Sequence, residues 1–471
     1  MRALTRPAAC RHRHAAGHRG RRTAVTGDRR RSCRRAKVQL TRGSACVEHN
    51  DAVPAADGSA AGVGGPRPRG SGTVECVSIY LDHAASTPLR PEAREAWLQA
   101  ASVVGNASSI HANGQSARRV LEDARERLAA AVGCDPIEIV ITSGGTEAVN
   151  LALKGLWQTR RAGTSDIVLP DGEHHASIDP VDWIARRDGA GIRSVPLTTR
   201  GAIDAAEFAA ALPGAALATA LVANNEVGTV NPVADLARAA ASERVPLHLD
   251  AVAAFGHMPV SFAGLRGDAR PGAGLLAMSL SAHKVGGPIG VGALVVARSA
   301  RLDPLLHGGG QQRGLRSGTQ DIAGAAAFAV AAELAVRELA EESARLSGMR
   351  DRLIAGVLAT IPAAELLGDP VDRLSGNAHI LFPGASGESL LFLLDMAGVS
   401  VSTGSACQAG VPEPSHVVTA MGRSDREARE VLRFTLGRST TDADIDAVLR
   451  VLPDAVERAR AASGSHTDGR S

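Results

Sequence analysis

Short apolar segments alternate with longer amphipathic ones between residues 137 and 280, and this alternation constrains the fold more than any other feature. The segments with the character of buried strands are Ile137–Thr142, Ile167–Pro170, Ala218–Ala223, Val245–Leu249 and Leu275–Leu280. Parallel strands need crossover connections, which are usually helices, and strands covered on both faces are apolar throughout. The sequence therefore predicts an α/β fold with a mainly parallel sheet flanked by helices.

The sequence after this region predicts a second domain. A long Ala-rich amphipathic segment, Ile322–Ile361, leads out of the sheet region, and shorter strand and helix patterns follow it. We expect a large domain over residues 76–332, whose first helix could pack with the smaller domain. A smaller α+β domain is expected over residues 333–462, followed by a polar tail over 463–471.

Residues 1–75 differ in composition from the rest of the chain. They hold 16 Lys and Arg against 5 Asp and Glu, a net charge of +11, whereas the whole chain carries +3. Without hydrophobic periodicity, such a segment buries too little apolar surface to fold. We expect a disordered basic tail or a start site assigned too far upstream. A signal peptide would need an apolar core, and a nucleic-acid arm would need interleaved aromatic residues, so direct nucleic-acid binding is not expected.

The cysteines and the apolar runs indicate where the protein works. None of the six cysteines forms a C-x-x-C pair, so neither a zinc site nor any other metal site is expected. The cysteine content suits a reducing compartment. No apolar run reaches the roughly 18 residues of a membrane span. We therefore expect a cytoplasmic protein with no membrane association.

Lys284 stands out because lysine is rare in this chain. There are three lysines, Lys37, Lys154 and Lys284, against 49 arginines. Arginine can replace lysine as a charge but not as a Schiff-base nucleophile, because its guanidinium group stays protonated. Lys284 follows Ser281 and His283 and precedes a Gly-Gly-Pro turn. It is either a surface lysine at a strand end or a reactive amine.

Polar residues follow several predicted strands, at the edge where open α/β sheets bind ligands. Ser143–Thr146 opens a helix with two glycines, which suits a phosphate, although such turns are common. Asp250 ends a strand and is either a helix N-cap or a partner for a protonated ring nitrogen. Turn chemistry explains Asn225 almost as well as ligand binding does. His174 is either structural or stacked on a flat ring, and the adjacent His175 points elsewhere.

Together these features suit pyridoxal 5′-phosphate (PLP) as a cofactor. The chain offers an amine for the aldehyde, a carboxylate for the ring nitrogen, a flat imidazole and a Gly/Ser/Thr turn for the phosphate. PLP is an electron sink that stabilises negative charge at the α-carbon of a substrate.

Eight motifs occur in order along the chain. They are Tyr80–Pro88, Gly105–His111, Thr142–Glu147, Asn224–Gly228, Ser281–Lys284, His307–Gly310, Arg316–Thr319 and Ser405–Cys407. In these motifs the chain resembles the NifS/IscS-like cysteine desulfurases of the class V aminotransferase superfamily over about residues 78–455. The resemblance implies PLP-transferase fold type I with a seven-stranded sheet, PLP-dependent cysteine desulfurase activity and a homodimer.

The resemblance also implies roles for individual residues. Lys284 would bind PLP covalently, and His174 would stack on its ring and move protons. Asp250 would pair with the pyridine nitrogen, and Asn225 would contact the ring hydroxyl. The phosphate would be held by small and polar residues, namely Gly145, Thr146, Ser281, His283 and, from the partner subunit, Thr319.

Arg433 would bind the substrate carboxylate. Leu432, Phe434 and Leu436 alternate with Arg433 and Thr435, so Arg433 faces away from the apolar side of its strand. A guanidinium fork matches a carboxylate well. The alternative is an exposed strand arginine.

Cys407 would make the chain a desulfurase rather than an aminotransferase. It lies in Ser402–Pro414, where small residues and prolines are typical of a mobile loop with a nucleophilic thiol. The loop resembles the long-loop, IscS-like group. The family usually has Gln at the position of Ala253, in contact with the ring hydroxyl. We therefore expect weaker tuning of the cofactor here, without loss of function.

We expect L-cysteine to be converted to L-alanine, with the sulfur passing to Cys407 as a persulfide. It would then move to an acceptor protein, either an iron–sulfur scaffold or a tRNA-thiolation enzyme. A selenocysteine lyase or another class V PLP enzyme is an alternative with the same fold. A sulfur-transfer scaffold with a degraded PLP site is the non-enzymatic alternative, which Ala253 supports weakly.

Overall fold

A seven-stranded sheet forms the centre of the larger part of the fold. The computed structural model describes residues 79–404 and 413–464. The strand order is β2 (Ile139–Thr142), β8 (Gly292–Val296), β7 (Gly274–Ser281), β6 (Pro246–Asp250), β5 (Leu217–Leu221), β3 (Asp166–Pro170) and β4 (Gly191–Val195). All neighbours from β7 to β4 are parallel, and β8 runs antiparallel to both β7 and β2. The predicted mainly parallel, seven-stranded α/β fold is confirmed.

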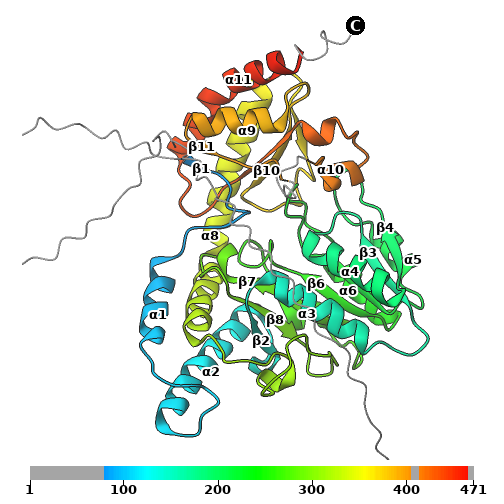
Figure 1. Ribbon diagram of the computed structural model, residues 1–471. Coiled ribbons are helices and arrows are strands. Elements are labelled where there is room, and N and C mark those ends of the chain that lie inside the picture. Colours follow the sequence, from blue (N-terminus) through cyan, green and yellow to red (C-terminus); the bar gives the residue numbers. More distant parts are fainter. Residues whose placement is uncertain (1–78, 405–412, 465–471) are drawn as a thin grey trace, which may run out of the picture. The chain divides into compact units, whose positions relative to one another are not determined.

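Helices follow most of these strands and cover the sheet (Figure 1). They are α3 (Gly145–Gln158), α4 (His175–Asp188), α5 (Ala205–Ala211), α6 (Val233–Ser242) and α7 (Phe262–Arg266). Strands β2, β5, β7 and β8 are buried at every residue, as expected for strands that are covered on both faces. The predicted strand from Ile137 begins later, because Pro136–Glu138 forms a 3-10 turn that Asp135 and Glu138 cap.

A three-stranded antiparallel sheet forms the smaller part. Its order is β12 (Val431–Thr435), β10 (Asn377–Leu381) and β9 (Glu365–Leu367). The helices in this part are α9 (Gly387–Met396), α10 (His416–Ala420) and α11 (Asp442–Gly464). The first strand of the described chain, β1 (Ile79–Tyr80), pairs in parallel with β11 (Val399–Ser400). Leu81 joins the hydrophobic core of the smaller part, so this core contains residues from both ends of the described chain.

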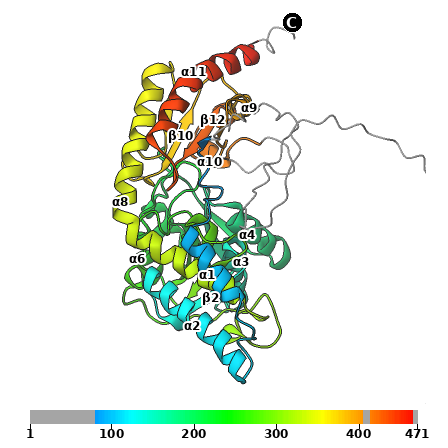
Figure 2. The same cartoon turned by 90° about the vertical axis from the view of Figure 1, so that its left-hand side faces the viewer.

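Helix α8 (Ile322–Thr360) connects the two hydrophobic cores. Its first half, up to Ala335, packs in the core of the large sheet, and its residues from Leu346 onward pack in the smaller core. Figure 2 shows α8 running along the side of the molecule past both sheets. The expected domain boundary between residues 332 and 333 lies within this helix and stays a prediction.

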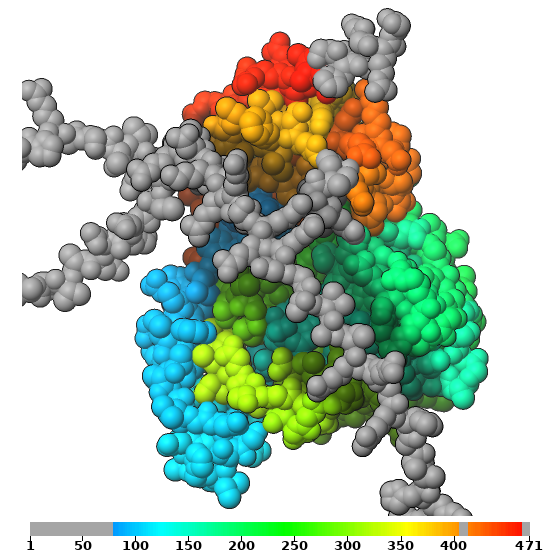
Figure 3. Space-filling view, in the orientation of Figure 1, coloured from blue at the N-terminus to red at the C-terminus, as the bar shows by residue number. Residues whose placement is uncertain are grey.

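Helices α1 (Pro91–Ala101) and α2 (Ala112–Val132) lie beside α8 at the outer edge of the larger part, in blue and cyan in Figure 3. The first of these helices contributes Ala93 to the larger core. In the ranges that the structure describes, no helix combines the length and apolar character that crossing a membrane requires. Those same ranges hold no group of three His, Cys, Asp or Glu side chains that could bind a metal ion.

Candidate active site

A cavity of about 450 Å³ lies at the carboxyl ends of the parallel strands, between the two sheets. Nine of the residues predicted for the site line it, namely Gly145, Thr146, His174, Asn225, Asp250, Ser281, His283, Lys284 and Arg433. Several of these residues lie at the end of a strand or directly after one. Asp250 is the last residue of β6, Ser281 is the last residue of β7, and Gly145 is the first residue of α3 after β2.

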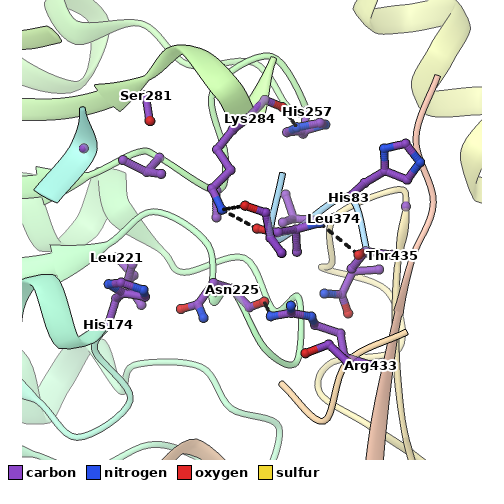
Figure 4. Close-up of a pocket in the computed structure, with 18 of the residues that line it drawn as sticks. His83, His174, Leu221, Asn225, His257, Ser281, Lys284, Leu374, Arg433 and Thr435 are labelled. Atoms are coloured by element: carbon purple, nitrogen blue, oxygen red, sulfur yellow. Dashed lines mark hydrogen bonds between the residues drawn. The ribbon is translucent and has the colours of Figure 1, made fainter. Parts of the chain in front are cut away.

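Lys284 occupies a 3-10 turn immediately after β7 and points to the middle of the cavity (Figure 4). Its Nζ donates to the carbonyl oxygens of Ala84 and Ala85, the latter at 3.1 Å. Burial, and then the nearby Arg433, lower the pKa of Lys284 to about 8, although Asp82 and Asp250 act in the opposite direction. The alternative of an ordinary surface lysine is therefore wrong, because this amine is largely buried and is deprotonated more readily than a free lysine.

Asp250 is buried at the floor of the cavity. Its Oδ1 accepts from the amide of Val252 at 2.9 Å within a turn, and no helix starts there, so the helix N-cap alternative is wrong. Burial raises the pKa of Asp250 to about 6, while the Val252 amide and Lys284 favour the charged form. A cationic ring nitrogen beside this carboxylate would satisfy it.

His174 makes a structural contact and also faces the cavity. It is the N-cap of α4, where its Nδ1 accepts from the amide of Ala176 at 3.0 Å, and its ring also lines the cavity. The His174 side chain is exposed towards the open cavity, but desolvation by the surrounding protein atoms, followed by Lys284, lowers its pKa to about 4, so the ring is neutral at physiological pH. With Nδ1 as acceptor, the proton is on Nε2. His175 points elsewhere, as predicted, and lies 3.2 Å from Asp179.

Arg433 is buried and already oriented. Leu432 and Phe434 pack in the smaller core on the other side of β12, which confirms the predicted alternation. The Nη2 atom of Arg433 lies 3.0 Å from Asp82 Oδ1, and Nη1 donates to the carbonyl oxygen of Asn225 at 2.9 Å. Only 6% of the Arg433 side chain is exposed, so the alternative of an exposed strand arginine is wrong.

The turn at Gly145 leaves room for an anionic group beside the start of α3. A Cβ atom at Gly145 would lie 2.7 Å from Val252 Cγ2 and 3.4 Å from Ser281 Cβ, so a larger residue here would force Val252 to shift. The first amides of a helix favour a phosphate, and the hydroxyl of Ser281 and the ring of His283 face the same cavity. These donors, the Asp250 carboxyl and the Lys284 amine form a set that fits PLP.

One predicted site residue is absent from the lining of this cavity, and another cannot be placed. Thr319 is exposed and does not line it, and we expected this residue to act in a partner subunit. Cys407 lies outside the described residues. Gly404, the last described residue before that gap, lines the cavity.

Several cavity residues had no predicted role. They are His83, His257, Leu374, Asn377, Ser402 and Thr435. His83 belongs to the Tyr80–Pro88 motif, and its Nδ1 lies 2.8 Å from Thr87 Oγ1. His257 Nε2 lies 3.0 Å from the carbonyl oxygen of Lys284. The remaining four come from the smaller part of the fold, whose placement beside the large sheet has no signal in the local sequence.

Comparison with known proteins gives consistent matches over the described chain. The family model described as Aminotransferase class-V matches residues 79–448. An IscS-like cysteine desulfurase of Mycobacterium tuberculosis is 47% identical over 392 residues, which cover 82% of this chain and 98% of that protein. A cysteine desulfurase IscS of Methanosarcina thermophila is 38% identical and covers 82% of this chain and 94% of its own length. The solved structure of a NifS-like protein superposes with a TM-score of 0.74 at 31% identity, over 81% of this chain and 100% of that chain.

Proposed function

We propose that this chain, which belongs to the class V aminotransferase family and within it to the IscS-like cysteine desulfurases, takes sulfur from L-cysteine and releases L-alanine. The observation that carries the proposal is the convergence of nine predicted residues, from segments far apart in the sequence, on one cavity around the Lys284 amine. This convergence speaks against a scaffold with a degraded site. The Lys284 amine, the Asp250 carboxylate and the Arg433 guanidinium group for the substrate carboxylate are all present. No observation favours a selenocysteine lyase.

The family implies PLP, and when bound it would supply an electron sink for negative charge at the substrate α-carbon. Lys284 would hold the cofactor covalently, and Asp250 would hold its ring nitrogen. His174 would lie against the ring, and Asn225 would contact its hydroxyl. The phosphate would be bound by the set of small and polar residues already described, Gly145, Thr146, Ser281 and His283, with Thr319 of a second copy completing it in a homodimer.

Three residues of this chain have separate roles in substrate binding and proton transfer. Arg433 binds the substrate carboxylate, because Asp82 and the Asn225 carbonyl already orient its guanidinium group. Lys284 removes the α-proton, since its lowered pKa makes it a base near neutral pH. His174 carries its proton on Nε2, because its Nδ1 accepts from the amide of Ala176, and so Nε2 can donate a hydrogen bond into the cavity.

The overall change balances without an external oxidant. The carbon–sulfur bond of cysteine breaks and hydrogen takes the place of sulfur on the β-carbon. The sulfur joins the thiol of Cys407 as a persulfide. Carbon is reduced while the two sulfur atoms are oxidised. An acceptor protein, either an iron–sulfur scaffold or a tRNA-thiolation enzyme, would then take the sulfur in the cytoplasm.

A matched pair of cysteine variants tests the proposal. We expect L-cysteine to yield alanine and a persulfide that mass spectrometry maps to Cys407, and Cys407→Ser to abolish both. Cys134→Ser serves as the control, because burial raises the pKa of the Cys134 thiol to about 12 and leaves it unreactive. Undiminished alanine formation by Cys407→Ser would refute the assignment of the nucleophile. Absence of alanine from the wild-type protein would refute the proposed function.

A further inference from the structure

The turn that carries Asn225 is fastened to the smaller part of the fold along its whole length. Four consecutive backbone carbonyl oxygens, those of residues 225–228, each accept a hydrogen bond from that part. The donors, in the same order, are Arg433 Nη1 at 2.9 Å, Asn377 Nδ2 at 3.1 Å, Arg373 Nη2 at 3.1 Å and the amide of Leu374 at 2.9 Å. We call this turn, residues 225–228, the clasped turn.

The close approach within the clasped turn requires glycine at one position. Gly228 has φ +79°, and a Cβ atom there would lie 2.6 Å from Asn377 Oδ1. The residue before the clasped turn also contacts a second part of the cavity wall. The side chain of Asn224, the residue before it, donates to the carbonyl oxygen of Gly172 at 3.0 Å, two residues before His174. The position of the clasped turn therefore affects both Asn225 and the turn that presents His174.

Arg373 is the donor in this arrangement that does not line the cavity. It is buried, with 7% of its surface exposed, and its guanidinium group contacts the carbonyl oxygens of Val227, Leu367 and Asn377. Within residues 79–404 and 413–464 it forms no ion pair. Burial and the nearby Arg350 lower its pKa to about 10, so it remains charged at neutral pH. Burying a cation whose direct partners are carbonyl oxygens is costly, and the nearby Asp351 and Asp369 offset part of this cost.

We infer that Arg373 is a positioning residue, whose buried guanidinium group holds the clasped turn so that Asn225 and His174 are placed to bind the cofactor. This inference rests on the proposed function, since it assumes that the cavity takes PLP. Arg373 touches neither substrate nor cofactor. It acts through the carbonyl oxygen of Val227, which follows Asn225 by two residues. A site whose supporting contacts are loosened binds its ligand less well even when the contacting residues are unchanged.

The test compares Arg373→Met with Arg460→Met. Arg460 offers a matched control, because it also holds two carbonyl oxygens, those of Pro362 and Pro383, but in the smaller part and outside the cavity lining. For each variant, the PLP dissociation constant, the visible absorption of the bound cofactor and the melting temperature of the cofactor-free protein are measured. We expect Arg373→Met to weaken PLP binding about tenfold or more, the effect of losing one charged hydrogen bond. Its absorption maximum should shift, whereas Arg460→Met should keep the wild-type PLP affinity and spectrum.

Arg373→Lys keeps the inference testable if Arg373→Met does not fold. Lysine retains the charge and at least one donor, so its PLP affinity should fall between those of the wild type and the methionine variant. Wild-type PLP affinity and spectrum in a folded Arg373→Met variant would overturn the inference. So would wild-type PLP binding by Arg373→Lys when Arg373→Met does not fold, or an equal weakening of PLP binding by Arg460→Met. Failure of the proposed function is recognised separately, because the wild-type protein would then form no alanine from L-cysteine.

Discussion

Arg433, in the cavity wall, forms an ion pair of 3.0 Å with Asp82, which joins the strand β12 to the segment that follows β1. The pair leaves the guanidinium group of Arg433 fixed before any substrate arrives. A preoriented fork loses less entropy when it binds a carboxylate than a free arginine does.

Replacing Arg433 by lysine should weaken the use of L-cysteine. Lysine keeps the charge but lacks the two parallel donors that match a carboxylate, and its shorter head cannot contact both Asp82 and the Asn225 carbonyl. We expect kcat/KM to fall by about 10- to 100-fold, with most of the change in KM. Steady-state kinetics with alanine detection measures this, and circular dichroism shows whether the fold persists. An unchanged KM would contradict the assignment.

The lowered pKa of Lys284 predicts how the cofactor-free protein takes up PLP. Only the unprotonated amine attacks an aldehyde, and burial and Arg433 lower the pKa of Lys284 to about 8. The rate constant for covalent binding should therefore rise with pH and level off above about 8. Nα-acetyl-lysine is the control. Its amine has a pKa of about 10.4, so the rate constant for its reaction with PLP should keep rising with pH up to about that value. A midpoint near 10 for the protein would contradict the lowered pKa.

Glu173 should make the cofactor-free protein less stable as the pH rises. It is fully buried, and desolvation raises its pKa from 4.5 to about 8. The protonated form is favoured in the folded state, so the contribution of Glu173 to stability is fully present below pH 4.5 and is lost as the pH rises to about 8. The loss is about 1.4 kcal/mol for each pH unit crossed.

Glu173→Gln removes this titration while keeping an oxygen for the Leu221 amide, to which Glu173 Oε1 is bonded at 2.7 Å. We expect the melting temperature of the variant to exceed that of the wild type at pH 8–9, and the difference to shrink towards pH 5. Asp179→Asn is a suitable control because Asp179 is exposed. A difference that does not vary with pH would show that Glu173 titrates normally.

Ala253→Gln should strengthen cofactor binding. The family usually has Gln at this position, and Ala253 lines the cavity without a side chain that can hydrogen-bond. One added hydrogen bond contributes about 1 kcal/mol, or roughly a fivefold lower PLP dissociation constant. Ala253→Leu controls for the added volume, because it fills the same space without an amide. Equal effects of the two variants would mean that filling space, rather than the amide, matters.

The sequence alone predicts the sheet and the strand-end residues well, because both depend on local patterns. Buried parallel strands are continuous apolar runs, and their carboxyl ends meet at one edge, which is why Asp250 and Ser281 share a cavity. The strand β8, Gly292–Val296, is also a continuous apolar run, but its reversed direction had no signal, since the direction depends on its pairing with β2 and β7.

Apart from Arg433, the residues that the smaller part contributes to the cavity could not be predicted. Leu374 and Asn377 enter the wall through hydrogen bonds to residues about 150 positions earlier, and no periodicity records contacts over that distance. Lys284 illustrates the same limit. The scarcity of lysine in this arginine-rich chain drew attention to Lys284. Its hydrogen bonds to the carbonyl oxygens of Ala84 and Ala85, however, are visible only in the folded structure.

The pairing of β1 with β11 sets the order in which this protein can be completed during synthesis. Ile79 donates from its amide to the carbonyl oxygen of Gly398 at 2.8 Å, and Leu81 is buried in the smaller core. On the ribosome, Leu81 emerges early, but its partners in the smaller core begin only at Leu346, and its backbone partner Ser400 follows later still. The growing chain therefore exposes this apolar segment for most of its synthesis, and the final closure is a slow, long-range step.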